Sequence, residues 1–299
     1  MRESPAFEEY RRNAARLITL PRLAAGSILT AALWFLTTAL AVGFAIAWTG
    51  TFYEDLLTSN IGILATLLSF SGMWAGVWLA VRLLHKDQVG NLMGANGRLS
   101  SLDFAKGFVA VILTSLAAEA AVCVVWPGFE RTPLPMAFWL AALGPMLLLC
   151  LLQTSAEEAL FRGYLLRGLA SRFRSPWIWG VLPALAFVFI HYSPEMSATD
   201  VLTVLFTVGA LTTVLVLLVR LTGNLGASMG VHMGNNVVAF LLIGHQDQFS
   251  YYALFVGAPL GGDESVAQTV FLIAARWVTA ALLWVLLSSR RSPLRVGAD

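Results

Sequence analysis

Residues 136–166 read MAFWLAALGPMLLLCLLQTSAEEALFRGYLL, and this stretch decides the class of fold. The first part, 136–152, carries no charge and approaches the roughly 20 residues that a helix needs to cross the hydrocarbon core of a bilayer. Glu157, Glu158 and Arg162 follow almost at once. Charged groups are costly to place in hydrocarbon, so these three side chains are candidates for a function.

The rest of the chain has the same apolar character. It has 299 residues, of which 58% are hydrophobic and 12% charged, and its mean hydropathy of +0.75 lies outside the range of soluble globular domains. We therefore predict an all-α, polytopic transmembrane helix bundle with about eight spans. They are expected at 25–48, 61–84, 107–126, 135–152, 177–191, 199–219, 226–244 and 266–288.

Lys and Arg residues alternate between the two sides of these spans. They gather before the first span, after the second, fourth, sixth and eighth, and the loops of the other side hold only Arg131. Because positively charged loops stay in the cytoplasm, both termini are expected there. The net charge of +2 reflects this bias. No basic run interleaved with aromatic residues lies outside the spans, so we expect the lipid bilayer and no nucleic acid as a partner.

The chain divides into three expected parts. Residues 1–24 form an amphipathic segment for the membrane interface, with Phe7, Tyr10 and Ala14 at helical spacing. Residues 25–289 form one integral membrane domain, whose catalytic core is expected at about 136–244, and residues 290–299 form a basic cytoplasmic tail. Short loops and the lack of a targeting motif are typical of a prokaryotic inner (cytoplasmic) membrane protein.

Two carboxylates at the end of the fourth span have different expected partners. Glu158 and Arg162 are four residues apart, with the acid first, so they share a helix face and can form an ion pair. Glu157 points about 100° away and is left to face another group. The alternative is a helix end at which all three side chains are in water.

Histidines on two further spans extend this group. The basic turn that contains Arg174 lies midway in sequence between Glu157 and His191, so a helical hairpin places these two residues at the same depth. In the span at 226–244, Gly226, Gly230 and Gly234 form a small-residue face for close helix packing. His232 and Asn236 lie on roughly the opposite face. They could present an imidazole and an amide to the bundle interior, or form a structural hydrogen bond between helices.

Such a set suits hydrolysis in two ways. A buried carboxylate can take a proton from water while a His and an Asn donate hydrogen bonds to an oxyanion. Alternatively, Glu157, His191 and His232 could bind a divalent metal such as zinc and leave one position open for water. Neither an HExxH nor a GxSxG motif is present, which disfavours zincins and α/β-hydrolases.

Three motifs now stand in order: EEALFR, with Glu157, Glu158 and Arg162; FVFIH, with Phe187 and His191; and HMGNN, with His232 and Asn236. Together they resemble the EExxxR, FxxxH and HxxxN motifs of the CPBP family of intramembrane proteases, which includes CaaX prenyl endopeptidases and bacteriocin-processing or immunity (Abi-type) proteins. The resemblance implies an intramembrane endopeptidase that acts on a membrane-associated protein or peptide. Glu157 with His191 would activate water, His232 with Asn236 would stabilise the oxyanion, and Glu158 and Arg162 would be supporting residues.

Other functions remain open from the sequence. The same polar set could hold helices together in a non-catalytic membrane scaffold or immunity-type partner, and a transporter is a third possibility. Outside the motifs, Glu119 and Arg276 have opposite charges inside two spans, so we predict a buried ion pair between them. His85 and His245 lie in loops at span edges and are expected to be in water.

Overall fold

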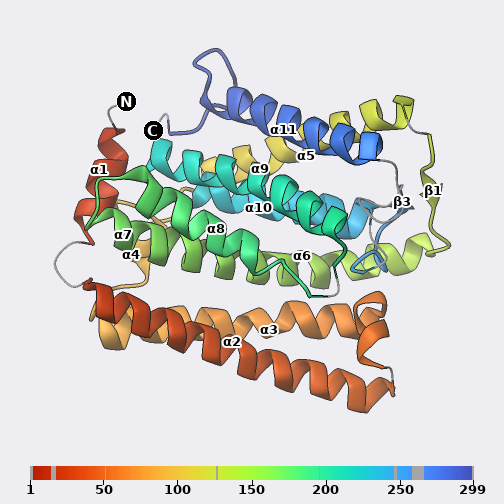
Figure 1. The fold of residues 1–299 in the computed structure, drawn as a ribbon, viewed down its shortest axis with the longest axis horizontal. Coiled ribbons are helices and arrows are strands. Elements are labelled where there is room, and N and C mark those ends of the chain that lie inside the picture. The colour runs from red at the N-terminus through yellow and green to blue at the C-terminus, as the bar shows by residue number, and fades with distance from the viewer. Residues whose placement is uncertain are drawn as a thin grey trace.

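The computed structural model describes residues 3–14, 18–50, 52–125, 127–194, 196–245, 248–257 and 266–297, and helices dominate it (Figure 1). Within these residues, six helices are long and apolar enough to cross a membrane. They are α2 (Leu20–Thr49), α3 (Asn60–Leu79, continued to Leu84), α5 (Ser101–Val125), α6 (Met136–Glu158, continued through α7, Arg167–Ala170), α9 (Ala198–Thr222) and α11 (Val266–Ser288). The prediction of an all-α membrane bundle is confirmed, and the chain is an integral membrane protein.

Two of the expected spans are shorter than the others. The fifth forms a helix over Trp177–Phe189, of which α8 is Leu182–Phe189. The seventh is α10 (Gly226–Val237), continued by a π-helical turn, Val238–Leu242. The helix of the fourth span begins at Met136 and continues beyond the apolar run to Ala170, as the hairpin between Glu157 and His191 requires. The number of eight spans and the cytoplasmic location of the termini stay predictions.

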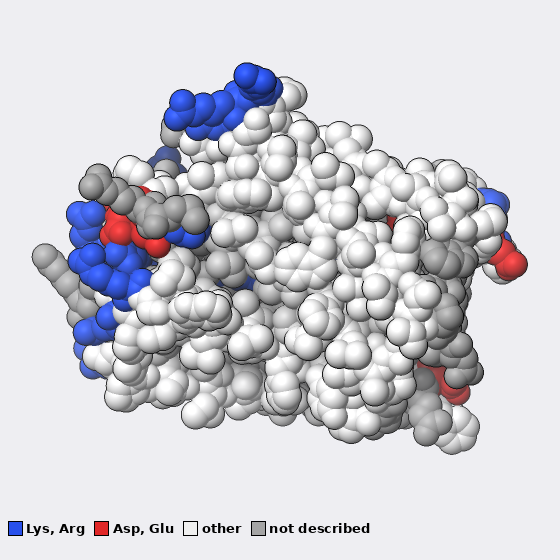
Figure 2. Space-filling view, turned by 45° about the horizontal axis from the view of Figure 1, so that its top comes forward, with Lys and Arg blue, Asp and Glu red and all other residues white. Residues whose placement is uncertain are grey.

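The helices are arranged around α6 and α10. The hairpin of α2 and α3 lies along one edge of the bundle, and α6 separates it from α5, α9, α10 and α11 (Figure 1). Both α1 (Pro5–Arg12) and the segment after α11 lie at the same end of the bundle. Figure 2 shows most Lys and Arg side chains of the visible face gathered at this end. The charge asymmetry read from the loops is therefore a property of the folded surface.

The glycine face of α10 packs directly on α5. A Cβ atom at Gly230 would lie 2.0 Å from the Phe104 carbonyl oxygen, and one at Gly226 would lie 2.3 Å from the Ser100 carbonyl oxygen. At Gly234, a Cβ atom would meet Val111 at 2.4 Å. Only glycine permits so close an approach, as the four-residue spacing predicted. The close packing fixes the rotation of α10, which turns His232 and Asn236 away from α5.

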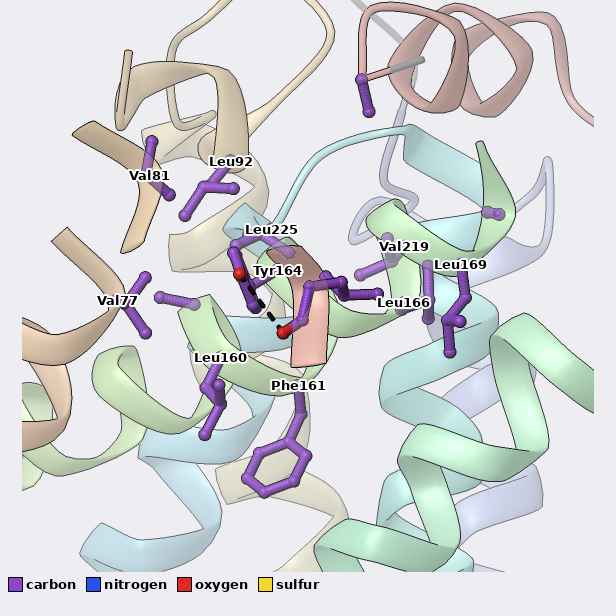
Figure 3. Packing of buried hydrophobic residues seen from close by; sticks show 14 of the residues in the cluster. Val77, Val81, Leu92, Leu160, Phe161, Tyr164, Leu166, Leu169, Val219 and Leu225 are labelled. Carbon is purple, nitrogen blue, oxygen red and sulfur yellow. Dashed lines mark hydrogen bonds between the residues drawn. The ribbon is translucent and has the colours of Figure 1, made fainter. Parts of the chain in front are cut away.

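The helix end that follows Glu158 is π-helical over Ala159–Leu166. Leu160, Phe161 and Tyr164 point from this stretch into a core that also contains Val77 and Leu225 (Figure 3). A π-helical turn is frequent at functional sites, because its wider backbone redirects side chains that an α-helix would place elsewhere.

The N-terminal helix α1 is docked onto the bundle. Phe7, Tyr10 and Ala14 are buried, and the Tyr10 hydroxyl donates to the Leu92 carbonyl oxygen at 2.5 Å. The Arg167 Nε atom donates to the Tyr10 carbonyl oxygen at 3.2 Å. The apolar face of this segment is thus covered by protein, and its place at the membrane interface stays a prediction.

Three two-residue strands lie at the opposite end of the bundle: β1 (Glu130–Arg131), β2 (Ile243–Gly244) and β3 (Phe255–Val256). β3 is the middle strand and pairs antiparallel with β1 and parallel with β2. This small sheet ties the end of α10 to the segment before α6. α4 (Gly90–Met93) is a single turn at the other end.

Candidate active site

Three helices supply the polar side chains of the site. Glu157 and Glu158 stand at the end of α6, with Arg162 in the π-helical continuation. His232 and Asn236 lie one turn apart on α10, and His191 follows α8. All three motif segments therefore converge inside the bundle, between the hairpin of α2 and α3 and the outer helix α11.

Glu158 is the centre of a buried hydrogen-bond network and is 0% exposed. Its Oε1 atom accepts from Arg162 Nη1 at 2.9 Å and from His232 Nδ1 at 2.9 Å. Its Oε2 atom accepts from the Ser228 hydroxyl at 2.6 Å. The predicted ion pair with Arg162 is confirmed. The bond to His232 joins α6 to α10, and it fixes the ring so that Nε2 points away from Glu158.

Arg162 has partners on all sides although it is 1% exposed. Besides Glu158, its guanidinium donates to the Thr212 hydroxyl of α9. Its Cζ atom lies 4.3 Å from the centre of the Phe187 ring on α8, in a cation–π contact. Arg162 thereby joins three helices around the carboxylates, and its supporting role in a reaction stays a prediction.

Glu157 has a different environment. It is 2% exposed, and its Oε2 atom makes no hydrogen bond with the residues that the structure describes. This atom lies 3.5 Å from His232 Nε2. As expected from the 100° offset, Glu157 faces away from Arg162 and toward another helix. A buried carboxylate oxygen without a hydrogen-bond partner is rare in folded proteins and is available to a water molecule or a substrate.

His191 stands beside the same aromatic ring as His232. Its Nδ1 atom donates to the Phe187 carbonyl oxygen at 2.9 Å, so that Nε2 is left as the acceptor. The Phe187 ring centre is 4.9 Å from that of His191 and 5.6 Å from that of His232. Among the described residues, no hydrogen bond joins His191 to Glu157. Their cooperation in activating water stays a prediction.

Asn236 lies between two other amides, of Asn235, a polar residue inside the same span, and of Gln153, which the sequence did not single out. Its Nδ2 atom donates to Gln153 Oε1 at 3.2 Å, and its Oδ1 atom accepts from Asn235 Nδ2 at 3.2 Å. Ser228, like Gln153, was missed. Both precede a motif residue by four positions, Gln153 before Glu157 and Ser228 before His232, so helical spacing was the signal that could have found them.

The metal alternative finds no support in the arrangement of ligands. Within the described residues, no three His, Cys, Asp or Glu side chains are grouped so that they could hold a metal ion. Glu157, His191 and His232 therefore do not form the two-His, one-carboxylate set considered from the sequence. No step proposed below passes through a metal.

A second polar cluster lies outside this site. Arg276 Nη2 is 2.9 Å from Glu119 Oε1, which confirms the predicted ion pair. His245 Nε2 is 3.0 Å from Glu119 Oε2, and His85 Nε2 is 2.7 Å from the Tyr164 hydroxyl. The expectation that His85 and His245 are in water was wrong, because the loops that carry them fold back onto buried polar groups.

Comparison with known proteins finds a family model that matches the segment containing the site. Residues 137–238 match the family described as type II CAAX prenyl endopeptidase Rce1-like. The matched segment contains all three motifs, so the resemblance inferred from them is confirmed. The uncharacterized protein YyaK of Bacillus subtilis (strain 168) is 26% identical over 219 residues, which cover 70% of each chain. No solved structure gives a significant match.

Proposed function

We propose that this chain, which is Rce1-like over residues 137–238, is an intramembrane endopeptidase that hydrolyses a peptide bond of a membrane-associated protein or peptide. The family match supports a protease of the CAAX type and peptide substrates in a membrane. The roles proposed for Glu157, His191, His232 and Asn236 are those that the resemblance to the CPBP family implies, and the contacts of these residues support them.

The observation that carries the proposal is the difference between the two adjacent carboxylates. Glu158 accepts three hydrogen bonds, whereas Glu157 leaves Oε2 without one beside His232 Nε2. A carboxylate that only holds helices together would be expected to have its oxygens paired, as those of Glu158 are. Glu157 is therefore the group that is free to accept a proton from water.

His232 is held between the two carboxylates. Its Nδ1 atom bonds to Glu158 at 2.9 Å, and its Nε2 atom, on the other side of the ring, lies 3.5 Å from Glu157 Oε2. In the proposed reaction, the Nε2 side of the ring faces the reacting centre. Glu158 and Arg162 position this ring and touch no substrate.

The reaction then follows from these positions. Glu157, assisted by the acceptor Nε2 of His191, takes a proton from water as the water oxygen attacks the peptide carbonyl carbon. His232, through Nε2, and the Asn236 amide donate hydrogen bonds to the oxyanion that forms. The carbon–nitrogen bond breaks as the carbonyl re-forms, and Glu157 returns the proton to the leaving amine.

The apolar surroundings favour a membrane substrate. A cavity of about 480 Å³ lies between α8 and α9, on the helix that leads to His191. Its lining is almost entirely hydrophobic and includes Leu185, Val188, Phe189 and Leu205. An apolar side chain or segment of the substrate fits such a lining better than a polar peptide does. We place the protein in a prokaryotic cytoplasmic membrane on its short loops and charge distribution.

The second candidate is a non-catalytic scaffold. The fully paired network of Glu158 with Arg162, His232 and Ser228 favours it, because such networks also serve to fix helix packing. This function needs Glu158, but it has no use for the unpaired oxygen of Glu157.

The test is cleavage of a library of membrane peptides by the purified protein in nanodiscs. We compare the natural chain with two variants. Glu157→Gln changes the site, and Glu130→Gln makes the same change at an exposed residue of β1, outside the site. Peptide products that disappear only in Glu157→Gln would support the protease. Products that persist in Glu157→Gln, or no products from a folded natural chain, would contradict it. A chelator arm tests metal dependence separately.

A further inference from the structure

A basic cavity of about 300 Å³, whose lining contains no motif residue, lies at the end of the bundle where the chain termini lie. It opens between α1 and the turn after α7. The charged side chains of its lining are Glu8, Arg11, Arg12, Arg172 and Arg174, so the lining has four positive charges and one negative charge. Figure 2 shows the blue surface of this end of the molecule. All four cations are arginines, and the proposed function does not use them.

Two of these arginines already have partners. Arg11 makes two hydrogen bonds to the Glu8 carboxylate, at 2.9 and 2.7 Å, and thereby neutralises the only acid of the cavity. Arg172 Nε donates to the Ile18 carbonyl oxygen at 2.7 Å, which holds the turn to the chain before α2. These contacts fix the shape of the cavity and leave the positive charge of Arg172 uncompensated.

Arg12 and Arg174 are different. Both are exposed, and neither side chain makes a hydrogen bond or an ion pair with the residues that the structure describes. The two arginines come from segments more than 150 residues apart and line the same cavity, so an anion in it would meet positive charge from both segments. A guanidinium presents a planar fork of donors that matches the oxygens of a phosphate.

The level of the cavity relative to the membrane indicates the source of the anion. Trp177 follows Arg174 by three residues and is 74% exposed, at the start of the apolar helix Trp177–Phe189. Exposed tryptophans at the ends of membrane helices mark the level of the lipid headgroups. The cavity therefore lies at the level of lipid phosphates, and its volume equals that of about ten water molecules, enough for a phosphate and an attached glycerol.

We propose that this cavity binds the phosphate headgroup of an anionic phospholipid from the leaflet on the side of the termini. Arg12 and Arg174 hold the phosphate oxygens, and Arg172 adds charge. The lipid joins α1 to the helix that carries Glu157, and it strengthens a docking that already includes the bond from Arg167 to Tyr10. The inference stands independently of the proposed peptidase activity.

The test counts lipids that stay bound to the full chain. Native mass spectrometry is performed on protein that was equilibrated in detergent with equal amounts of phosphatidylglycerol and phosphatidylcholine. The pocket variant is Arg12→Gln with Arg174→Gln. The matched control is Arg290→Gln with Arg291→Gln. It removes two exposed arginines of the segment after α11, which lies at the same end of the bundle. Melting temperatures with and without inorganic phosphate are measured in parallel.

We expect the natural chain and the control to retain phosphatidylglycerol in preference to phosphatidylcholine. The pocket variant should lose this preference, because its affinity for phosphatidylglycerol should fall by about fivefold for each arginine removed. An equal loss in both variants would mean diffuse attraction to the basic surface and would overturn the proposal. A site that inorganic phosphate fills as well as the lipid does would overturn it too.

Discussion

Replacing Glu158 by Gln should destabilise the bundle far more than the same change at Glu157. At 158, one fully buried side chain accepts from Arg162, His232 and Ser228. The amide removes the negative charge, so the buried Arg162 guanidinium loses its ion-pair partner and keeps Thr212 and the Phe187 ring as its other contacts. Breaking a buried ion pair in this way costs about 3 to 5 kcal/mol, a large part of the stability of a typical domain.

At 157 the neutral amide removes a buried charge that has no hydrogen bond at Oε2. Little pairing is lost and some desolvation cost is relieved, so we expect the free energy of unfolding to change by less than about 1 kcal/mol. The two variants are compared by reversible unfolding in mixed micelles with increasing dodecyl sulfate, followed by tryptophan fluorescence. Equal losses of stability, or a larger loss at Glu157, would refute the distinction between a structural and a reactive carboxylate.

Two further predictions concern packing and the second polar cluster. Gly230→Ala should separate α10 from α5 and lower stability by about 1 to 3 kcal/mol, because its Cβ atom would overlap the Phe104 carbonyl oxygen. Gly209→Ala should not lower stability, because nothing lies within 4 Å of the new Cβ atom. Similar melting temperatures for the two variants would contradict the account of close packing. Glu119→Gln should also destabilise the fold, since Arg276 and His245 both lose a charged partner. The double variant with Arg276→Gln should recover part of the loss in a double-mutant cycle, and strict additivity would exclude the pairing.

Features that depend on residues close together in the chain could be predicted from the sequence. Uninterrupted apolar runs specify the membrane helices, because hydrocarbon leaves the backbone no other partner than itself. Four-residue spacing on one helix specified the Glu158–Arg162 pair and the glycine face of α10. Opposite charges inside two spans required a partner, which was enough to predict the pairing of Glu119 with Arg276.

Tertiary structure decided the contacts between segments far apart in the chain. His232 meets both carboxylates because α5 covers the glycine face of α10 and α6 lies beside the face with His232, and no spacing in the sequence encodes which helices become these neighbours. The docking of α1 and the burial of His85 and His245 have the same cause, since each depends on a partner more than 75 residues away. Side chains on one helix are related by its fixed geometry, whereas the meeting of two helices is set by how all their surfaces pack at once.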